Sequence, residues 1–357
     1  MALLEPQTVD ELLTLASENK ATDLHISVGS RPRYRKDGNI TEMKEYTIIT
    51  PAIMTRMINP IMDAYAKTIL NSTGQYDMSY SVPKVARYRV NIFRQKGDLA
   101  AVFRVLPDTI PDYTKLGLPT SIFNVYKKRR GLILIVGPTG SGKTTTLASF
   151  LDVINKNTYK HIITLEEPIE YVHWHARSLI NQREIGTDCD TFANGLRAAL
   201  REDPDVILVG EMRDLETTSI AVTSAETGHL VCSTLHTLGA SETISRIIDM
   251  YPVTQQAQIR SQLTSILEAV VSQQLMPKIG GGYVVAYEIM YKNKRIKELI
   301  RDNNIDAINE YLTTNEAIQE GMCSMDQTIL QLYHKGKITR QTALDFAFDV
   351  KEMSYKV

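Results

Sequence analysis

The stretch GLILIVGPTGSGKTTTLASFLDVI, residues 131–154, carries the strongest structural signal in the sequence. Apolar residues at 132–136 run into a glycine-rich turn that ends in Lys-Thr-Thr, and a helix-like segment follows. The turn matches the pattern G-x-x-x-x-G-K-[ST], in which glycine lets backbone N–H groups point inward at phosphate oxygens. We therefore predict a strand, a phosphate-binding loop and a helix, in that order.

The side chains of this loop predict how phosphate is held. Lys143 is expected to contact the terminal phosphates of a nucleotide, and the Thr144 hydroxyl is expected to bind Mg²⁺. The predicted nucleotide-binding residues are Gly137, Pro138, Thr139, Gly140, Ser141, Gly142, Lys143, Thr144 and Thr145.

Composition limits the class of protein. The chain has 357 residues, of which 43% are hydrophobic, and this is enough for two domains with buried cores. Its formal net charge is −1, so a nucleic-acid partner is not expected. No apolar run approaches the roughly 20 residues that span a bilayer, and the first residues do not resemble a signal peptide. We expect a cytoplasmic protein without direct membrane insertion, which reaches any membrane through partners.

The chain downstream of residue 119 has the pattern of a doubly wound sheet. Short apolar runs, among them HIITLEE, DVILVGE and HLVCSTLH, alternate with helix-like segments. This alternation is typical of an α/β domain with a mostly parallel sheet. We assign residues 120–277 to this domain and residues 278–357 to a C-terminal, mostly helical extension.

The upstream part of the chain has a different pattern. Residues 1–106 contain helix-like segments and strands that favour antiparallel pairing. In VARYRVNIF, Tyr88 and Val90 are expected on an apolar face and Arg89 on a polar face, because side chains alternate along a strand. The proline-containing residues 107–119 are interpreted as a linker between two domains.

Acidic residues follow two of the apolar runs. DVILVGEMRD places Glu211 just after a buried strand, and we expect this carboxylate near the phosphate loop because parallel strand ends lie side by side. ITLEEPIEYVH holds Glu166, Glu167 and Glu170 around a proline. Such a cluster suits a metal or the orientation of a water molecule. The residues alone do not show which of the three acts as a base.

Two further patterns contain histidine. TGHLVCSTLHT places His229 and His236 at the two ends of one strand-like run. No cysteine or third histidine stands at zinc-ligand spacing, so we expect neutral, hydrogen-bonding histidines near a phosphate. HWH at residues 173–175 is expected on the surface.

The order and spacing of these motifs resemble the secretion and type IV pilus motor ATPases, and most closely the PilT-type pilus retraction ATPases. The resemblance includes the phosphate loop, TLEEPIE, ILVGEMRD and GHLVCSTLHT, and it extends from DLHISVG near the start to GMCSMDQTI near the end. It implies an N-terminal PAS-like α+β domain followed by a RecA-like P-loop ATPase domain. It also implies a hexameric ring that hydrolyses ATP with Mg²⁺.

The resemblance implies roles for individual residues. Glu170 would be the base for the attacking water, and Glu211 would be the Walker B acid that helps to hold Mg²⁺. Arg89 and Arg104 would reach a nucleotide at a subunit or domain boundary. His229 and His236 would sense the phosphate state. The implied catalytic residues are Glu170, Glu211, Glu166, Arg89, Arg104, His229 and His236.

The implied partners are further copies of the chain, the inner-membrane pilus platform protein and the pilin machinery. The expected location is therefore the cytoplasm, peripheral to the inner face of the cell membrane.

The sequence departs from the family pattern in two places. Glu167 stands where the family usually has Asp, and RIKELIRD at 295–302 stands where the retraction ATPases carry AIRNLIRE. In the second segment, Ile296, Leu299 and Ile300 recur at helical spacing and are expected to be buried.

Three other functions remain open. A pilus-assembly or type II secretion ATPase is one, although the tetracysteine insertion that is usual in those proteins is not found in this sequence. A nucleic-acid translocase on the same core is another. The third is a nucleotide-binding regulator that does not hydrolyse ATP.

Overall fold

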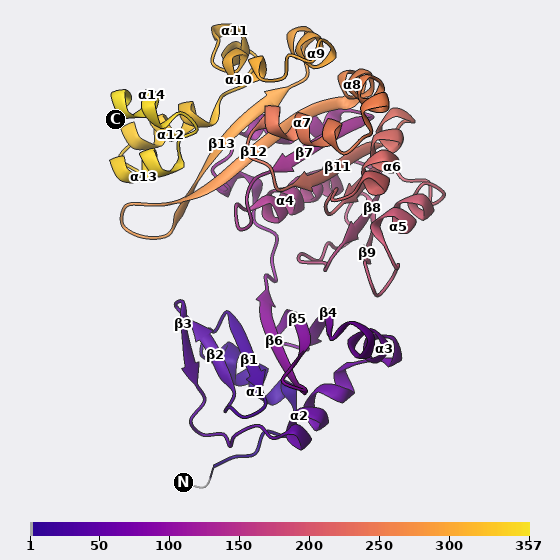
Figure 1. The fold of residues 1–357 in the computed structure, drawn as a ribbon, viewed down its shortest axis with the longest axis vertical. Helices are drawn as coiled ribbons and strands as arrows, with labels where there is room; N and C mark the ends of the chain where they lie inside the picture. The colour runs from indigo at the N-terminus through magenta and orange to yellow at the C-terminus, as the bar shows by residue number, and fades with distance from the viewer. Residues whose placement is uncertain (1–2) are drawn as a thin grey trace. The chain divides into compact units, whose positions relative to one another are not determined.

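The computed structural model describes residues 3–357, which divide into two compact units (Figure 1). The first unit runs to Thr109 and also includes residues 168–172, and the rest of the chain from residue 110 forms the second. The division lies within the predicted linker at 107–119. Residues 110–119 belong to the second unit, where Ser149 Oγ donates a 2.8 Å hydrogen bond to the carbonyl oxygen of Pro111.

The first unit is built on a six-stranded antiparallel sheet with the strand order β3-β2-β1-β6-β5-β4. Its strands are β1 (Asp23–Ser27), β2 (Arg33–Lys36), β3 (Asn39–Glu42), β4 (Gln75–Val82), β5 (Ala86–Gln95) and β6 (Asp98–Leu106). Its helices are α1 (Val9–Glu18), α2 (Pro51–Ile58) and α3 (Ala64–Thr73), and η1 (Asn59–Ile61) is a 3₁₀ turn. The predicted α+β character of this part of the chain is confirmed.

One face of this sheet is apolar and the other is polar. Tyr88 and Val90 of β5 are buried in a core that includes Leu12 and Leu13 of α1. Arg89 lies between them in sequence and is exposed, because neighbouring side chains on a strand point to opposite faces. The predicted alternation is confirmed, and it leaves a polar face on which arginines gather.

The second unit contains a seven-stranded sheet with the order β13-β12-β7-β11-β10-β8-β9. All neighbours are parallel except β12 and β13. The strands are β7 (Gly131–Val136), β8 (His161–Glu166), β9 (Leu179–Glu184), β10 (Val206–Val209), β11 (Leu230–Leu235), β12 (Leu267–Pro277) and β13 (Tyr283–Tyr291).

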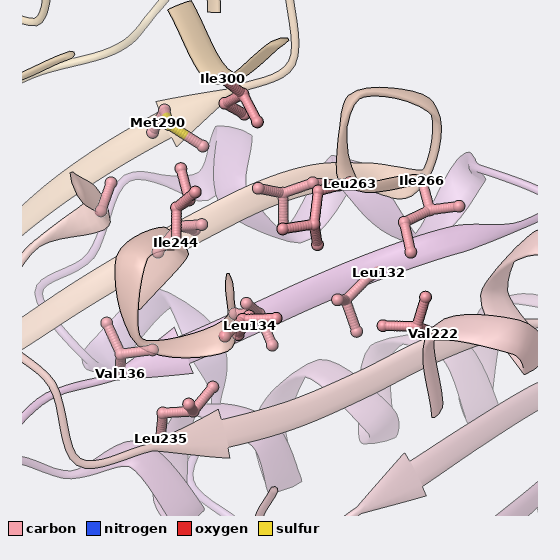
Figure 2. Close-up of a cluster of buried hydrophobic side chains, with 14 of the residues drawn as sticks. Leu132, Leu134, Val136, Val222, Leu235, Ile244, Leu263, Ile266, Met290 and Ile300 are labelled. Atoms are coloured by element: carbon pink, nitrogen blue, oxygen red, sulfur yellow. The ribbon is translucent and has the colours of Figure 1, made fainter. Parts of the chain in front are cut away.

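Helices cover both faces of this sheet. Leu132, Leu134 and Val136 of β7 pack in one apolar cluster with residues of α6, α7 and α8, including Ile244 (Figure 2). Ile133 belongs to a second cluster, on the side of α4. The helical segments here are η2 (Tyr113–Lys115), η3 (Thr120–Lys127), α4 (Lys143–Asn157), α5 (Phe192–Ala199), α6 (Leu215–Glu226), α7 (Ala240–Asp249) and α8 (Val253–Ile266). The predicted doubly wound α/β fold is confirmed.

The sheet continues beyond residue 277, where the predicted ATPase domain ends. β13 pairs with β12 over the whole length of β13, from Tyr283 opposite Pro277 to Tyr291 opposite Ala269. A domain boundary at 277 would therefore divide a hairpin, because both strands belong to one sheet. The helical extension begins after β13.

This extension consists of short helices. Ile296, Leu299 and Ile300 of the first are buried, as predicted for RIKELIRD. No helix in residues 3–357 is long and apolar enough to cross a membrane. The helices of the extension are α9 (Lys294–Arg301), α10 (Ala307–Tyr311), α11 (Asn315–Gln319), α12 (Met325–His334), α13 (Arg340–Phe346) and α14 (Val350–Lys356).

The segment HWH, predicted on the surface, is only partly exposed. Trp174 and His175 are exposed, but His173 is buried at 8% exposure, with its backbone N–H bonded to Gln182 Oε1 at 2.7 Å. Burial lowers the pKa of His173 to about 4, and the charges of Asp152 and Lys156 act in opposite directions. The folded chain therefore keeps this imidazole neutral at neutral pH.

This burial predicts a pH-dependent stability. Below about pH 6.5 the unfolded chain binds a proton at His173 that the folded chain does not bind, so the free energy of unfolding should fall as the pH falls toward 4. Between pH 7 and pH 5 the contribution of His173 is about 2 kcal/mol. Urea unfolding followed by circular dichroism should show a weaker pH dependence in His173→Gln than in wild type.

The exposed neighbour provides the control. His175→Gln should retain the wild-type pH dependence, and an unchanged dependence in His173→Gln would contradict the prediction.

Candidate nucleotide-binding site

Three strands of the second unit end side by side where the phosphate loop begins. In the parallel register, Val136 of β7 lies opposite Leu235 of β11, and Val209 of β10 lies opposite Ser233 of β11. The residues that follow these strands therefore emerge at one edge of the sheet, where ligands bind in open α/β folds. This edge carries the phosphate loop, Glu211 and His236.

The phosphate loop has a backbone that requires glycine at its first position. Gly137 has φ 146°, and a Cβ atom there would lie 2.3 Å from the carbonyl oxygen of Gln273 and 2.6 Å from Ser141 Oγ. Ser141 is buried, and its Oγ has no hydrogen-bond partner among the described residues. Helix α4 follows, and its first N–H groups lack acceptors within the helix. The glycine cradle, the unpartnered hydroxyl and the helix N-terminus fit a bound phosphate group.

The ammonium group of Lys143 lies inside this loop. Its Nζ donates to the carbonyl oxygens of Gly137 and Pro138 at 2.8 and 3.0 Å, and it lies 3.5 Å from Nδ1 of His236. Because an ammonium group can only donate, Nδ1 is the acceptor, and Nε2 carries the ring proton. Burial and the charge of Lys143 lower the pKa of His236, although Glu211 acts in the opposite direction. The imidazole is therefore neutral at neutral pH, in agreement with the prediction from the sequence.

Glu211 lies on the other side of the same histidine. Its Oε2 is 3.6 Å from His236 Nε2 and 2.6 Å from Arg213 Nε, and its side chain is 13% exposed. The chain just before it is fixed by a 2.6 Å hydrogen bond from Thr234 Oγ1 to the carbonyl oxygen of Gly210. Glu211 thus emerges beside the phosphate loop, as expected for a carboxylate at the end of a parallel strand.

The three acids of TLEEPIE have different surroundings. Glu166 ends β8, and its Oε1 accepts hydrogen bonds from Thr164 Oγ1 at 2.7 Å and from Gln182 Nε2 at 2.9 Å. Glu167 is exposed, and Glu170 is half-buried. Glu170 belongs to the first unit, whereas the phosphate loop belongs to the second. The role of Glu170 as a base therefore stays a prediction.

Only one of the two motif histidines lies at the phosphate edge. His229 precedes Leu230, which pairs with Gly131 at the opposite end of β7 from the loop, and its Nδ1 is 3.0 Å from the carbonyl oxygen of Ser224. The six residues of β11 separate it from His236, and a strand of this length spans about 20 Å. The structure brings His236, but not His229, to the phosphate loop of its own chain.

The two arginines of the predicted set lie on the polar face of the first unit's sheet. Arg89 of β5 is directly opposite Arg104 of β6, which is opposite Asp23 of β1 on its other side. Asp23 is buried, and its Oδ1 accepts a 2.8 Å hydrogen bond from Arg104 Nε. Burial acts to raise the pKa of Asp23, but hydrogen bonds from Arg104 and Thr22 outweigh it and hold the pKa below its ordinary value. The guanidinium group of Arg104 is thus oriented, although the side chain is 70% exposed.

Three residues that position these groups were not identified from the sequence. Arg213 pairs with Glu211, Gln182 bonds to Glu166, and Asp23 bonds to Arg104. Gln182 and Asp23 act from a neighbouring strand, and the register that joins two strands is not visible in a single sequence. The only signal for Asp23 was its place in the motif DLHISVG.

The oxygen atoms at this edge also fit Mg²⁺. Thr144 lies in the first turn of α4, and together with Glu211 it offers a hydroxyl and a carboxylate. Mg²⁺ commonly takes one or two protein oxygens and fills its other positions with water and phosphate. Within residues 3–357, no group of three or more His, Cys, Asp or Glu could hold a metal by itself.

The chain is similar to known proteins over most of its length. A family model described as type II/IV secretion system protein matches residues 2–345. The chain is 42% identical to the type IV pilus retractation ATPase PilT of Pseudomonas aeruginosa, over 95% of this chain and 98% of that protein. It is 44% identical to a twitching motility protein of Neisseria gonorrhoeae, over 84% of this chain and 80% of that protein.

The fold is similar to a solved structure over nearly the whole chain. The crystal structure of the pilus retraction motor PilT with bound ADP matches with a TM-score of 0.91 and 44% identity, and the match covers 98% of this chain and 100% of that one. The phosphate loop, the carboxylate after β10 and the histidine after β11 thus occur in a chain that belongs to the family of type II/IV secretion system proteins.

Proposed function

We propose that this chain is a motor ATPase that hydrolyses ATP to drive the retraction of type IV pili. The observation that carries the proposal is the row of neighbouring groups Lys143, His236 and Glu211, with separations of 3.5 and 3.6 Å, beside a phosphate loop. Such a row can bind a nucleotide and respond to its phosphate state. The similarity to a pilus retraction ATPase over nearly the whole chain supports retraction as the work performed.

Nucleotide binding would change the partners of Lys143. Its ammonium group donates to the carbonyl oxygens of Gly137 and Pro138. Phosphate oxygens carry negative charge and are stronger acceptors than neutral carbonyls, so a triphosphate would draw the ammonium group toward itself. Movement of the ammonium group would change its 3.5 Å contact with His236 Nδ1. We propose that His236 senses the phosphate state through this change.

Hydrolysis requires a base for the attacking water. We propose that Glu170 accepts the proton as the water oxygen attacks the terminal phosphorus, while the bond to the departing ADP breaks. Lys143 would neutralise part of the charge on the phosphate oxygens. Mg²⁺, held by Thr144 and Glu211 when bound, would supply further positive charge there. Glu166 would fix the start of the acidic segment through its bonds to Thr164 and Gln182.

Arg89 and Arg104 are proposed to complete a nucleotide site from the first unit of a neighbouring chain in a hexameric ring. Asp23 engages Arg104 through Nε, so the two terminal nitrogens remain to face a phosphate group. Arginine supplied from outside a P-loop core stabilises charge on the transferring phosphoryl group. The partners proposed outside the ring are the pilus platform protein and the pilin machinery, at the cytoplasmic face of the inner membrane.

Replacing the loop lysine tests the enzymatic assignment. Lys143→Ala should reduce ATP hydrolysis to background and weaken ATP binding, because the ammonium group that faces the terminal phosphates is lost. The measurement is phosphate release from pure protein, with and without DNA. Lys156→Ala is the control, since Lys156 lies on the same helix in an exposed ion pair with Asp152 and should leave turnover unchanged. Turnover of Lys143→Ala within a few-fold of wild type would contradict the site.

The same assay separates the other functions. Strong stimulation of wild type by DNA would favour a translocase, and the absence of any turnover would favour a regulator.

A second set of variants identifies the base. Glu170→Gln keeps the shape of the side chain but cannot accept the proton, so ATP should bind and persist while turnover falls by about 10²–10⁴-fold. Glu167→Asp restores the family's usual residue and should be tolerated. Single-turnover hydrolysis of bound ATP measures both. An active Glu170→Gln together with an inactive Glu166→Gln would assign the role to Glu166 instead.

The shared site predicts rescue in mixed rings. Arg104→Ala should lower turnover by about 10–1,000-fold without unfolding the chain, since the side chain is mostly exposed. Mixing Arg104→Ala with Lys143→Ala protein should restore part of the activity, because some sites then combine an intact loop with an intact arginine. Arg94→Ala is a matched control on the same strand as Arg89, where Arg94 bonds to Asn71. No rescue in rings shown to be mixed would place the site within one chain.

A further inference from the structure

One buried carboxylate, that of Glu288 on β13, bonds both to the helix that follows the nucleotide edge and to the first of the last three helices. Glu288 is 2% exposed. Its Oε1 accepts the N–H of Ala240 at 2.7 Å, and its Oε2 accepts the N–H of Met325 at 3.4 Å. Ala240 is the first residue of α7 and Met325 the first residue of α12. Helix N-termini attract negative charge, and here two of them share one carboxylate.

The first of these helices is tied to the nucleotide edge. α7 begins four residues after His236. The connecting loop is fixed by hydrogen bonds from Gly239 N–H to Ser272 Oγ at 3.0 Å and from Thr243 Oγ1 to the Gly239 carbonyl at 2.6 Å, and Thr237 Oγ1 lies 2.8 Å from Thr243 Oγ1. A loop held this closely would pass a displacement of His236 to the first turn of α7.

The second helix is tied to the end of the chain. Asp326, in the first turn of α12, accepts the N–H groups of Phe348 and Asp349 at 2.7 and 2.8 Å, and Asp349 caps α14. The Phe348 ring also approaches the loop that follows His236. A Cβ atom on Gly239 would lie 3.2 Å from this ring and 3.3 Å from Glu288 Oε1. The carboxylate and the ring therefore both contact the point where α7 begins.

The same junction borders a cavity of about 570 Å³, lined by residues of α10, α12 and α14. Glu288, Glu310, Asp326 and Glu352 contribute to its wall. Elements beside free space can shift, whereas a close-packed interior resists movement. Burial raises the pKa of Glu288, the N–H groups of the two helices oppose that effect, and Asp326 adds to it.

We propose that Glu288 is a positioning residue that couples the nucleotide state at His236 to helices α12–α14 by holding the N-termini of α7 and α12 on one carboxylate. The inference rests on the proposed nucleotide site and adds the route by which the C-terminal helices respond to it. When the partners of Lys143 change, the loop after His236 and the N-terminus of α7 move. The carboxylate group moves with the N–H of Ala240, to which it has the shorter bond. The length of its longer bond to the N–H of Met325 then changes.

Hydrogen exchange of backbone amides in the full chain tests this coupling. Peptides are compared by mass spectrometry with and without Mg²⁺ and ADP. In wild type, ADP should slow exchange at residues 137–145, and it should change exchange at residues 325–329 by about fivefold or more, the lower end of typical allosteric coupling. In Glu288→Gln, a single amide oxygen replaces the two carboxyl oxygens that accept the N–H groups of Ala240 and Met325. The response at 137–145 should persist, and the response at 325–329 should be lost.

Ser324→Ala separates coupling from simple loss of structure. Ser324 Oγ caps α12 by accepting the N–H of Gln327, and within residues 3–357 it is not hydrogen-bonded to Glu288. This variant should raise exchange at residues 325–329 in both states and keep the ratio between them.

The possible results are distinct. No effect of ADP at residues 137–145 would overturn the nucleotide site itself. An effect there without one at 325–329 in wild type would overturn the coupling alone, and this comparison does not depend on the folding of any variant. A full response in Glu288→Gln, or an equal loss in Ser324→Ala, would also overturn it.

Discussion

The parallel register of β7, β11 and β10 is the constraint on which the nucleotide edge depends. Every residue of these three strands is buried, so apolar contacts on both faces of the sheet fix their alignment. A slip of one residue would move His236 by about 3.3 Å along the strand. It would break the approach of His236 to both Lys143 and Glu211. The polar chemistry at the edge is therefore set by packing in the core.

The electrostatics of the edge follow from that placement. The side chain of Lys143 is buried, and a buried ammonium group requires acceptors. Two loop carbonyls serve this purpose, and they hold the charge less firmly than phosphate would. A protonated His236 would place a second positive charge 3.5 Å from the first. The lowered pKa of His236 avoids this repulsion and keeps an uncharged hydrogen-bonding group between the lysine and Glu211.

Local patterns made much of the fold and part of the site predictable. The glycine spacing predicted the phosphate loop, and the alternation around Arg89 predicted the two faces of the first sheet. The burial of His173 and the pairing of β13 with β12 depend on contacts between segments, which local patterns do not contain. The separation of His229 from His236 was different, because seven residues along an extended strand already imply a distance of roughly 20 Å. The sequence therefore already implied that the two histidines lie apart. We expected both near the phosphate because they belong to one motif.

Buried carboxylates fasten separate elements together in both units. Asp23 holds Arg104 across two strands, Glu288 holds two helix N-termini, and Glu268 pairs with both Lys128 and Lys292. A carboxylate is costly to bury alone, and removing one of its partners leaves an uncompensated charge. Elements joined by such a group are therefore expected to move together rather than separately. The elements joined by Glu288 connect the nucleotide edge to the end of the chain. Of the two bonds that Glu288 accepts, the one from Met325 is longer, at 3.4 Å against 2.7 Å, and is therefore the weaker.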